Sequence, residues 1–161
     1  TRGTLSKFLI FPHPSKVIPI IGFFMAIKFF KLVLNYYMQK KCKICIKNHE
    51  IVVSLKNTAT AELIWKSLPF SSDINLWGEE VYFYTNLSSE LEDDAKDIIS
   101  FGEIAYWPSG KAIAIGYGKT PISRSSEIRL ADRCNIWGET EYDLKKLKDV
   151  ISGEKVEILK C

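Results

Sequence analysis

The chain of 161 residues has little of several residue types, and each scarcity excludes a class of function. Its four cysteines are too few and too irregularly spaced for a secreted disulfide scaffold, and its only histidines are His13 and His49. Cys42 and Cys45 form a CxxC pair without a second pair elsewhere, inside an alternating run in which residues three apart face opposite sides of a strand. We therefore predict no metal centre, no redox pair and no cofactor.

Acidic residues are absent from residues 1–37, which carry five basic residues. The other 124 residues therefore hold 17 of the 22 basic residues and all 19 acidic ones, which gives them a net charge of −2. The slightly basic character of the whole chain thus comes from its N-terminal part. The rest has no basic footprint for nucleic acid, so we expect no nucleic-acid partner.

A long hydrophobic run occurs at residues 17–37, interrupted by Lys28 and Lys31. A transmembrane helix would bury both lysines near mid-span, at about 2.5–3.5 kcal/mol each. A signal peptide would need a small-residue cleavage site after Lys28, and none follows. We favour a third interpretation, in which residues 1–37 are an extension that precedes the working protein, and residues 38–161, from Met38, form one cytoplasmic domain. Membrane attachment through residues 17–37 is the alternative if the extension is retained.

Two apolar runs around a turn predict a central β-hairpin, Ile104–Trp107 followed by Ala112–Tyr117. In the second run, Ile113, Ile115 and Tyr117 form a large face, whereas Ala112, Ala114 and Gly116 form a small one. A strand with one small face allows another element or a ligand to approach closely. Such a strand suits a small closed barrel better than an open sheet edge.

The remaining pattern predicts further strands and two short helices. The predicted strands are 42–46, 50–55, 82–85, 130–136 and 155–159, and the predicted helices are 59–67, capped by Asn57 or Thr58, and 142–150, with Leu144, Leu147 and Ile151 inward. The acidic stretch at residues 90–97 is expected to be a solvated loop or a short helix. The fold class is thus mainly β.

Residues 75–82 (NLWGEEVY) and 135–142 (NIWGETEY) match at five of eight positions. We interpret the repeat as a strand that ends in a buried Trp with a Gly bend, used twice. The functional alternative places Glu79 and Glu139 together as paired carboxylates for acid–base chemistry. A Trp-Gly corner requires no chemistry, so the structural interpretation is favoured.

Three segments, NLWGEEVYF, GEIAYWPSGKAIAIGYGKTPIS and GEKVEI, resemble the uncharacterised prokaryotic cyclophilin-like domain family. The resemblance runs from about Lys40 to Lys160, with Ser109 at the position of a second proline usual in the family. It implies a closed eight-stranded cyclophilin-like β-barrel with a short helix at each mouth. True cyclophilins, which are prolyl isomerases, place an arginine beside the twisting amide, and residues 80–86 contain none.

A fold alone does not define an activity. We therefore expect a barrel that binds an extended peptide or a small ligand without strong catalysis, and we predict no catalytic residue. The expected groove residues are Tyr82, Tyr84, Tyr106, Trp107, Lys111 and Tyr117. The alternatives are a weak peptidyl-prolyl cis–trans isomerase and a structural or partner-binding module.

Overall fold

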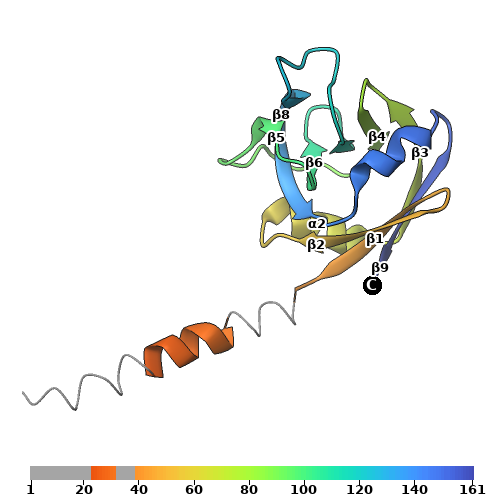
Figure 1. The fold of residues 1–161 in the computed structure, drawn as a ribbon. Helices are drawn as coiled ribbons and strands as arrows, with labels where there is room; N and C mark the ends of the chain where they lie inside the picture. Colours follow the sequence, from red (N-terminus) through yellow and green to blue (C-terminus); the bar gives the residue numbers. More distant parts are fainter. Residues whose placement is uncertain (1–22, 32–38) are drawn as a thin grey trace, which may run out of the picture. The chain divides into compact units, whose positions relative to one another are not determined.

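The computed structural model describes residues 23–31 and 39–161 (Figure 1). Residues 23–31 are helical, and they belong to a separate unit, residues 1–39, from the compact unit formed by Lys40–Cys161. Among the described residues, no helix is long and apolar enough to cross a membrane. Most of the hydrophobic stretch 17–37, and Met38 with it, lies outside the described residues, so the predicted start of the domain stays a prediction.

The compact unit contains nine strands and two short helices. The strands are β1 (Lys41–Ile46), β2 (His49–Leu55), β3 (Phe70–Leu76), β4 (Glu80–Tyr84), β5 (Lys96–Ile99), β6 (Glu103–Trp107), β7 (Ala112–Gly116), β8 (Ile128–Glu139) and β9 (Lys155–Lys160). The helices are α2 (Ala59–Ser67) and the 3₁₀ helix η2 (Leu144–Asp149). As predicted, α2 begins after Thr58, whose side-chain oxygen accepts a hydrogen bond from the amide of Ala61.

Eight of the strands form a near-closed ring in the order β2-β1-β9-β3-β4-β7-β6-β8 (Figure 1). All of these pairings are antiparallel, and β8 returns to β2 through only two residue pairs, Ser54 with Glu139 and Leu55 with Gly138. The predicted cyclophilin-like fold class is confirmed. The ninth strand, β5, was not predicted; it pairs with β8 outside the ring and begins within the acidic stretch.

The main hydrophobic core fills the ring and joins side chains from almost every strand. Its largest fully buried members are Trp137, Tyr106 and Phe83, and Ile64 of α2 and Leu147 of η2 belong to the same cluster. The hydroxyl of Tyr106 donates a hydrogen bond to the carbonyl oxygen of Leu87 at 2.8 Å. Buried aromatic residues therefore keep their polar atoms satisfied.

A second, smaller cluster lies on the outer side of the central hairpin, where β8 covers β7. Ala105, Ala114, Ile128 and Leu130 belong to it. A Cβ atom at Gly116 would lie only 2.5 Å from Cγ2 of Ile128, so a larger residue would push the two strands apart. The predicted small face of β7 does allow another element to approach closely.

Two predictions about local structure are wrong in part. Ile151 is 63% exposed rather than inward, because η2 is a 3₁₀ helix that ends at Asp149, and Ile151 follows it. The two Trp-Gly segments do not occupy equivalent places: Trp77 is half-buried after β3, beside Gly78 with φ +63°, whereas Trp137 is fully buried inside β8.

Candidate ligand-binding site

Alternation along β4 separates its side chains into two sets. Val81 and Phe83 belong to the core inside the ring. Because successive side chains of a strand point to opposite faces, Glu80, Tyr82 and Tyr84 lie on the outer face. The rings of Tyr82 and Tyr84 meet edge to face, with 5.8 Å between their centroids.

The register places alanines between these tyrosines and the neighbouring tryptophan. Ala112 of β7 lies opposite Tyr84 of β4 and opposite Trp107 of β6, and Ala114 lies opposite Tyr82. Large side chains on the two outer strands therefore flank small side chains on the middle strand. This pattern produces a groove along β7.

The groove contains a cavity of about 340 Å³, which we call the aromatic cavity. This volume is in the range of small-molecule sites. The cavity is lined by Trp77, Glu80, Tyr82, Tyr84, Trp107, Ala112, Ala114, Leu130, Ala131 and Cys134.

Three of the six predicted groove residues, Tyr82, Tyr84 and Trp107, line the aromatic cavity. Tyr106 and Tyr117 belong instead to the core of the ring. Tyr106 precedes Trp107 on one strand, so their side chains face opposite sides of the sheet.

Lys111, the remaining predicted groove residue, is exposed in the β6–β7 turn with φ +50° and lines neither this cavity nor the one described below. Its carbonyl oxygen accepts a hydrogen bond from the amide of Thr85 at 2.7 Å.

Glu80 was missed by the sequence prediction, although alternation in the EEVYFY run places it with Tyr82 and Tyr84. Glu80 is only 6% exposed, and its Oε2 atom is buried without a hydrogen-bond partner among the described residues. Burial raises the pKa of Glu80 to about 7. Burial and the neighbouring charge of Glu80 raise the pKa of the Cys134 thiol to about 12.

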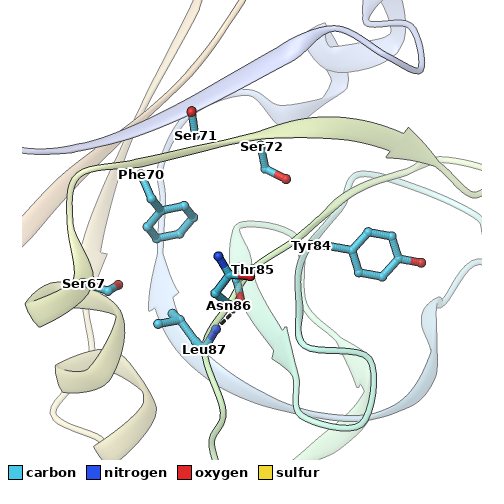
Figure 2. A pocket seen from close by; sticks show the side chains of 8 residues that line it. All are labelled: Ser67, Phe70, Ser71, Ser72, Tyr84, Thr85, Asn86 and Leu87. Carbon is cyan, nitrogen blue, oxygen red and sulfur yellow. Dashed lines mark hydrogen bonds between the residues drawn. The ribbon is translucent and has the colours of Figure 1, made fainter.

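A second cavity, of about 420 Å³, opens where β3 and β4 separate (Figure 2). The two strands pair only from Ile74 to Leu76 on β3, while the first part of β3 pairs with β9. Phe70 and Ser72 line one side of this cavity, and Tyr84 and Leu87 line the other. Tyr84 lines both cavities, so it lies between them.

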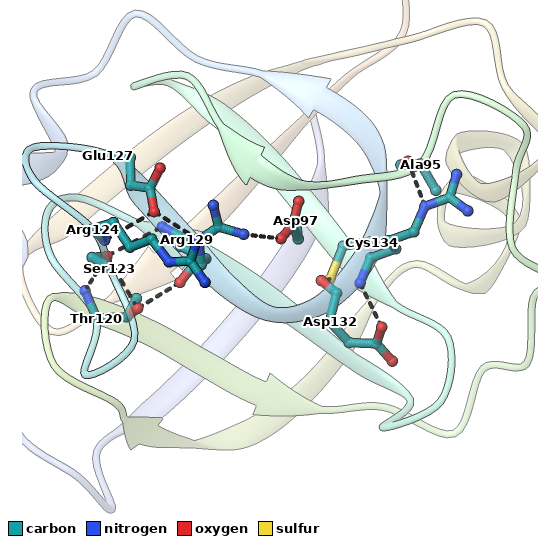
Figure 3. A network of polar contacts seen from close by, with 10 residues as sticks. Ala95, Asp97, Thr120, Ser123, Arg124, Glu127, Arg129, Asp132 and Cys134 are labelled. Atoms are coloured by element: carbon teal, nitrogen blue, oxygen red, sulfur yellow. Dashed lines mark hydrogen bonds and ion pairs between the residues drawn. The ribbon is translucent and has the colours of Figure 1, made fainter.

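The arginines of β8 are engaged in polar networks beside β5 (Figure 3). Arg129 pairs with Asp97 and, at 2.7 Å, with Glu127. The Nε atom of Arg133 donates a hydrogen bond to the carbonyl oxygen of Ala95 at 3.0 Å. Neither arginine lines either cavity.

The carboxylates of the repeated segment do not form a shared site. The Oε2 atom of Glu79 accepts a hydrogen bond from the amide of Lys119 at 2.7 Å, whereas Glu139 pairs with Lys56 at 2.8 Å. Each glutamate thus stabilises its own loop or strand end.

Cys42 and Cys45 lie on β1, where the alternating burial pattern buries Cys42 and leaves Cys45 partly exposed, as the strand interpretation predicts. Within the described ranges, no group of three or more His, Cys, Asp or Glu residues is arranged to hold a metal ion.

A polar cluster links β2 with the C-terminal part of the chain. The ring nitrogens of His49 contact the hydroxyl of Tyr142 at 2.8 Å and the carboxylate of Asp149 at 2.7 Å. The hydrogen bond with His49 lowers the pKa of Asp149. His49 is 6% exposed, so we interpret this cluster as a structural contact that holds η2 against the β1–β2 hairpin.

The near-closed ring with a cavity on its outer face defines a small β protein of the cyclophilin type. The sequence model of the Cyclophilin-like family matches residues 40–159, and the chain belongs to this family.

Solved structures also resemble the chain. The solution structure of a hypothetical protein from Archaeoglobus fulgidus is 35% identical, with a TM-score of 0.66, over 76% of this chain and 95% of the other. The structure of McbB in complex with tryptophan is 17% identical, with a TM-score of 0.53, over 73% of this chain and 44% of the other, and this likeness concerns the fold alone. No curated protein matches the chain.

Proposed function

We propose that the chain binds a small organic ligand or an extended peptide segment in the aromatic cavity, without strong catalysis of its own. The observation that carries the proposal is the arrangement of Trp107 and Tyr84 on either side of Ala112, with Tyr82 and Trp77 completing an aromatic wall. Aromatic side chains around a concave apolar surface are typical of ligand sites. Rings held by a rigid sheet also lose little conformational entropy on binding.

The second cavity supports the extended-peptide form of the proposal. Because Tyr84 lines both cavities, a ligand that extends past its ring would reach the space between Phe70 and Leu87. There β3 and β4 are not paired with each other, so their backbones do not close the opening.

The alternative activity, prolyl isomerisation, requires charge stabilisation beside the twisting amide, and an arginine supplies a planar fork for it. Arg129 is engaged with Glu127 and Asp97, and Arg133 with Ala95. These contacts favour binding over isomerisation.

The four tryptophans provide the test, because each indole N–H gives a separate signal in a proton–nitrogen NMR spectrum. The full chain is titrated with an X-Pro tetrapeptide that ends in phenylalanine. We expect the indole signals of Trp77 and Trp107 to shift, while those of Trp65 and Trp137, which do not line the cavity, stay in place.

A protease-coupled isomerisation assay with the same tetrapeptide separates the alternatives. We expect the rate to equal the uncatalysed background. A higher rate that is lost in Tyr84→Ala would instead establish an isomerase. If none of the indole signals shifts with the tetrapeptide or with the one-ring probes used below, the proposal is wrong and the fold serves as a structural or partner-binding module.

A further inference from the structure

Glu80 gives the aromatic cavity a chemical preference. A carboxyl group that is 6% exposed and leaves its Oε2 atom without a hydrogen bond costs free energy, which a ligand that supplies a donor would recover. Among the buried side-chain nitrogen and oxygen atoms of the described residues, Oε2 of Glu80 alone has no partner. The unsatisfied atom thus belongs to a residue that lines the cavity.

The register explains why Glu80 is buried at this place. It lies opposite Gly116 on β7, and Ile128, at the start of β8, packs closely over that glycine. β8 therefore covers the end of the groove where Glu80 lies. None of the ten residues that line the cavity carries a positive charge, so the cavity itself supplies no counter-ion for the carboxylate.

We propose that the aromatic cavity selects organic ammonium ions, in particular small primary amines that carry one aromatic ring. Their N–H groups would donate to the carboxylate of Glu80, and their apolar part would lie against Tyr82 and Trp107. This inference rests on the proposed function and names its ligand class. Cations also interact favourably with the faces of tyrosine and tryptophan rings, which adds to the pairing with the carboxylate.

The test compares three probes of similar shape and different charge: 2-phenylethylammonium, the neutral 2-phenylethanol and the anionic 3-phenylpropanoate. Dissociation constants for the full chain are measured at about pH 8 from the indole signals of Trp77 and Trp107. Since a hydrogen bond to a charged group is stronger than one between neutral groups, we expect the ammonium to bind at least about tenfold more tightly than the alcohol, which corresponds to about 1.4 kcal/mol. The carboxylate probe should bind most weakly.

Two variants locate the effect. Glu80→Gln removes the charge but keeps the shape, and it should reduce the preference for ammonium over alcohol to about twofold or less, as expected for loss of a charge-assisted hydrogen bond. The matched control is Glu141→Gln, which removes the same charge from an exposed position and should leave the preference unchanged. An equal loss in both variants would mean that net charge, not Glu80, attracts the cation.

Acidic pH provides an independent readout in the wild-type chain. Burial and the charge of Glu80 raise the pKa of Tyr82 on its own strand and of Cys134 on β8. The β7 residue opposite Glu80 is Gly116, and the further carboxylates that act on Cys134 are Asp132 on β8 and Asp97 on β5. The pKa values of Tyr82 and Cys134 are both raised, so these groups stay neutral at about pH 5 and at about pH 8. Protonation of Glu80 should therefore weaken ammonium binding at the lower pH, while alcohol binding stays constant.

The outcomes separate the two proposals. If the alcohol and the ammonium bind equally well and Glu80→Gln changes neither, the cavity binds ligands but does not select cations, and only this inference fails. If none of the three probes shifts the indole signals of Trp77 or Trp107 but the tetrapeptide does, the inference also fails alone. If the tetrapeptide and all three probes leave the signals in place, the proposed function fails with it.

Discussion

The two faces of β4 differ in what their side chains accomplish. On the inner face, Val81 and Phe83 are fully buried in the core of the ring. On the outer face, Tyr84 is 53% exposed, and Glu80 is buried with an unsatisfied oxygen. The inner face stabilises the fold, whereas the outer face keeps a cavity open and a carboxyl group unpaired. Adjacent residues of one strand therefore allow the two roles to be separated by mutation.

The largest expected effect comes from truncating neighbours on the two faces. Phe83→Ala should lower the free energy of unfolding by about 3–5 kcal/mol, because it removes a fully buried ring and leaves a cavity. Tyr84→Ala should cost less than about 1 kcal/mol, because that ring is half exposed. Urea denaturation of both variants measures the difference. Equal losses would contradict the assignment of the two faces.

The next effect concerns the charge on the outer face and depends on pH. The folded chain holds the pKa of Glu80 at about 7, above the ordinary value of 4.5, so folding favours the protonated form. The contribution of Glu80 to the free energy of unfolding of the wild-type chain is therefore fully present below about pH 4.5, and it is lost as the pH rises through about 7.

Glu80→Gln cannot ionise and should avoid that loss. Since the pKa rises from 4.5 to about 7 and one pKa unit corresponds to about 1.4 kcal/mol, the variant should be more stable than wild type by roughly 3 kcal/mol at pH 8. The difference should nearly vanish at about pH 3.5, one unit below the ordinary pKa of 4.5, where the folded and unfolded wild-type chains are both largely protonated. Thermal and urea unfolding across this range measure it. A variant that is less stable than wild type at pH 8 would show that the carboxylate has a favourable partner.

A smaller effect is expected where a glycine supports the wall of the cavity. A Cβ atom at Gly110 would lie 2.0 Å from Cε3 of the Trp107 ring, so Gly110→Ala must displace that ring. Because Trp107 is only half-buried and can move, we expect a loss of about 1–2 kcal/mol. The indole signal of Trp107 should shift while that of Trp77 stays in place. An unchanged Trp107 signal would mean that the backbone moves instead.

Much of the fold could be predicted from local pattern. Alternation and turn residues identified the β6–β7 hairpin, and the two candidate caps Asn57 and Thr58 identified the start of α2, because these features depend on neighbours in the sequence. The small face of β7 also predicted that another element approaches it closely, which β8 does.

Strand β5, which was not predicted, depends on contacts that the local sequence does not reveal. The acidic stretch in which it begins has the composition of a solvated loop, but the fully buried side chain of Asn135 holds the first part of that stretch in place. Asn135 accepts a hydrogen bond from the amide of Glu92 and donates one to the carbonyl oxygen of Glu90. A partner more than 40 positions away cannot be found from composition.

The candidate site was predictable only in part for the same reason. Alternation alone could assign Tyr82, Tyr84 and Glu80 to one face of β4. The burial of Glu80 depends on β8, which lies about 50 residues later in the chain and covers the end of the groove. A charged residue in a strand is normally exposed, so the burial of Glu80 and its unsatisfied oxygen could be found only from the structure.

The smallest expected effect tests whether tyrosine hydroxyls on the two faces are used differently. Inside the ring, the hydroxyl of Tyr106 donates to the carbonyl oxygen of Leu87, so Tyr106→Phe should cost about 1 kcal/mol by leaving that oxygen unpaired. On the outer face, Tyr82→Phe should change stability by less than about 0.5 kcal/mol, because Tyr82 is only half-buried and lines the cavity rather than the core. Loss of the Tyr82 hydroxyl should appear in ligand binding instead, because Tyr82 lines the cavity. Chemical denaturation of both variants measures the two stability losses, and the indole titration of Tyr82→Phe measures its effect on ligand binding. A larger stability loss in Tyr82→Phe than in Tyr106→Phe would reverse the roles assigned to the two faces.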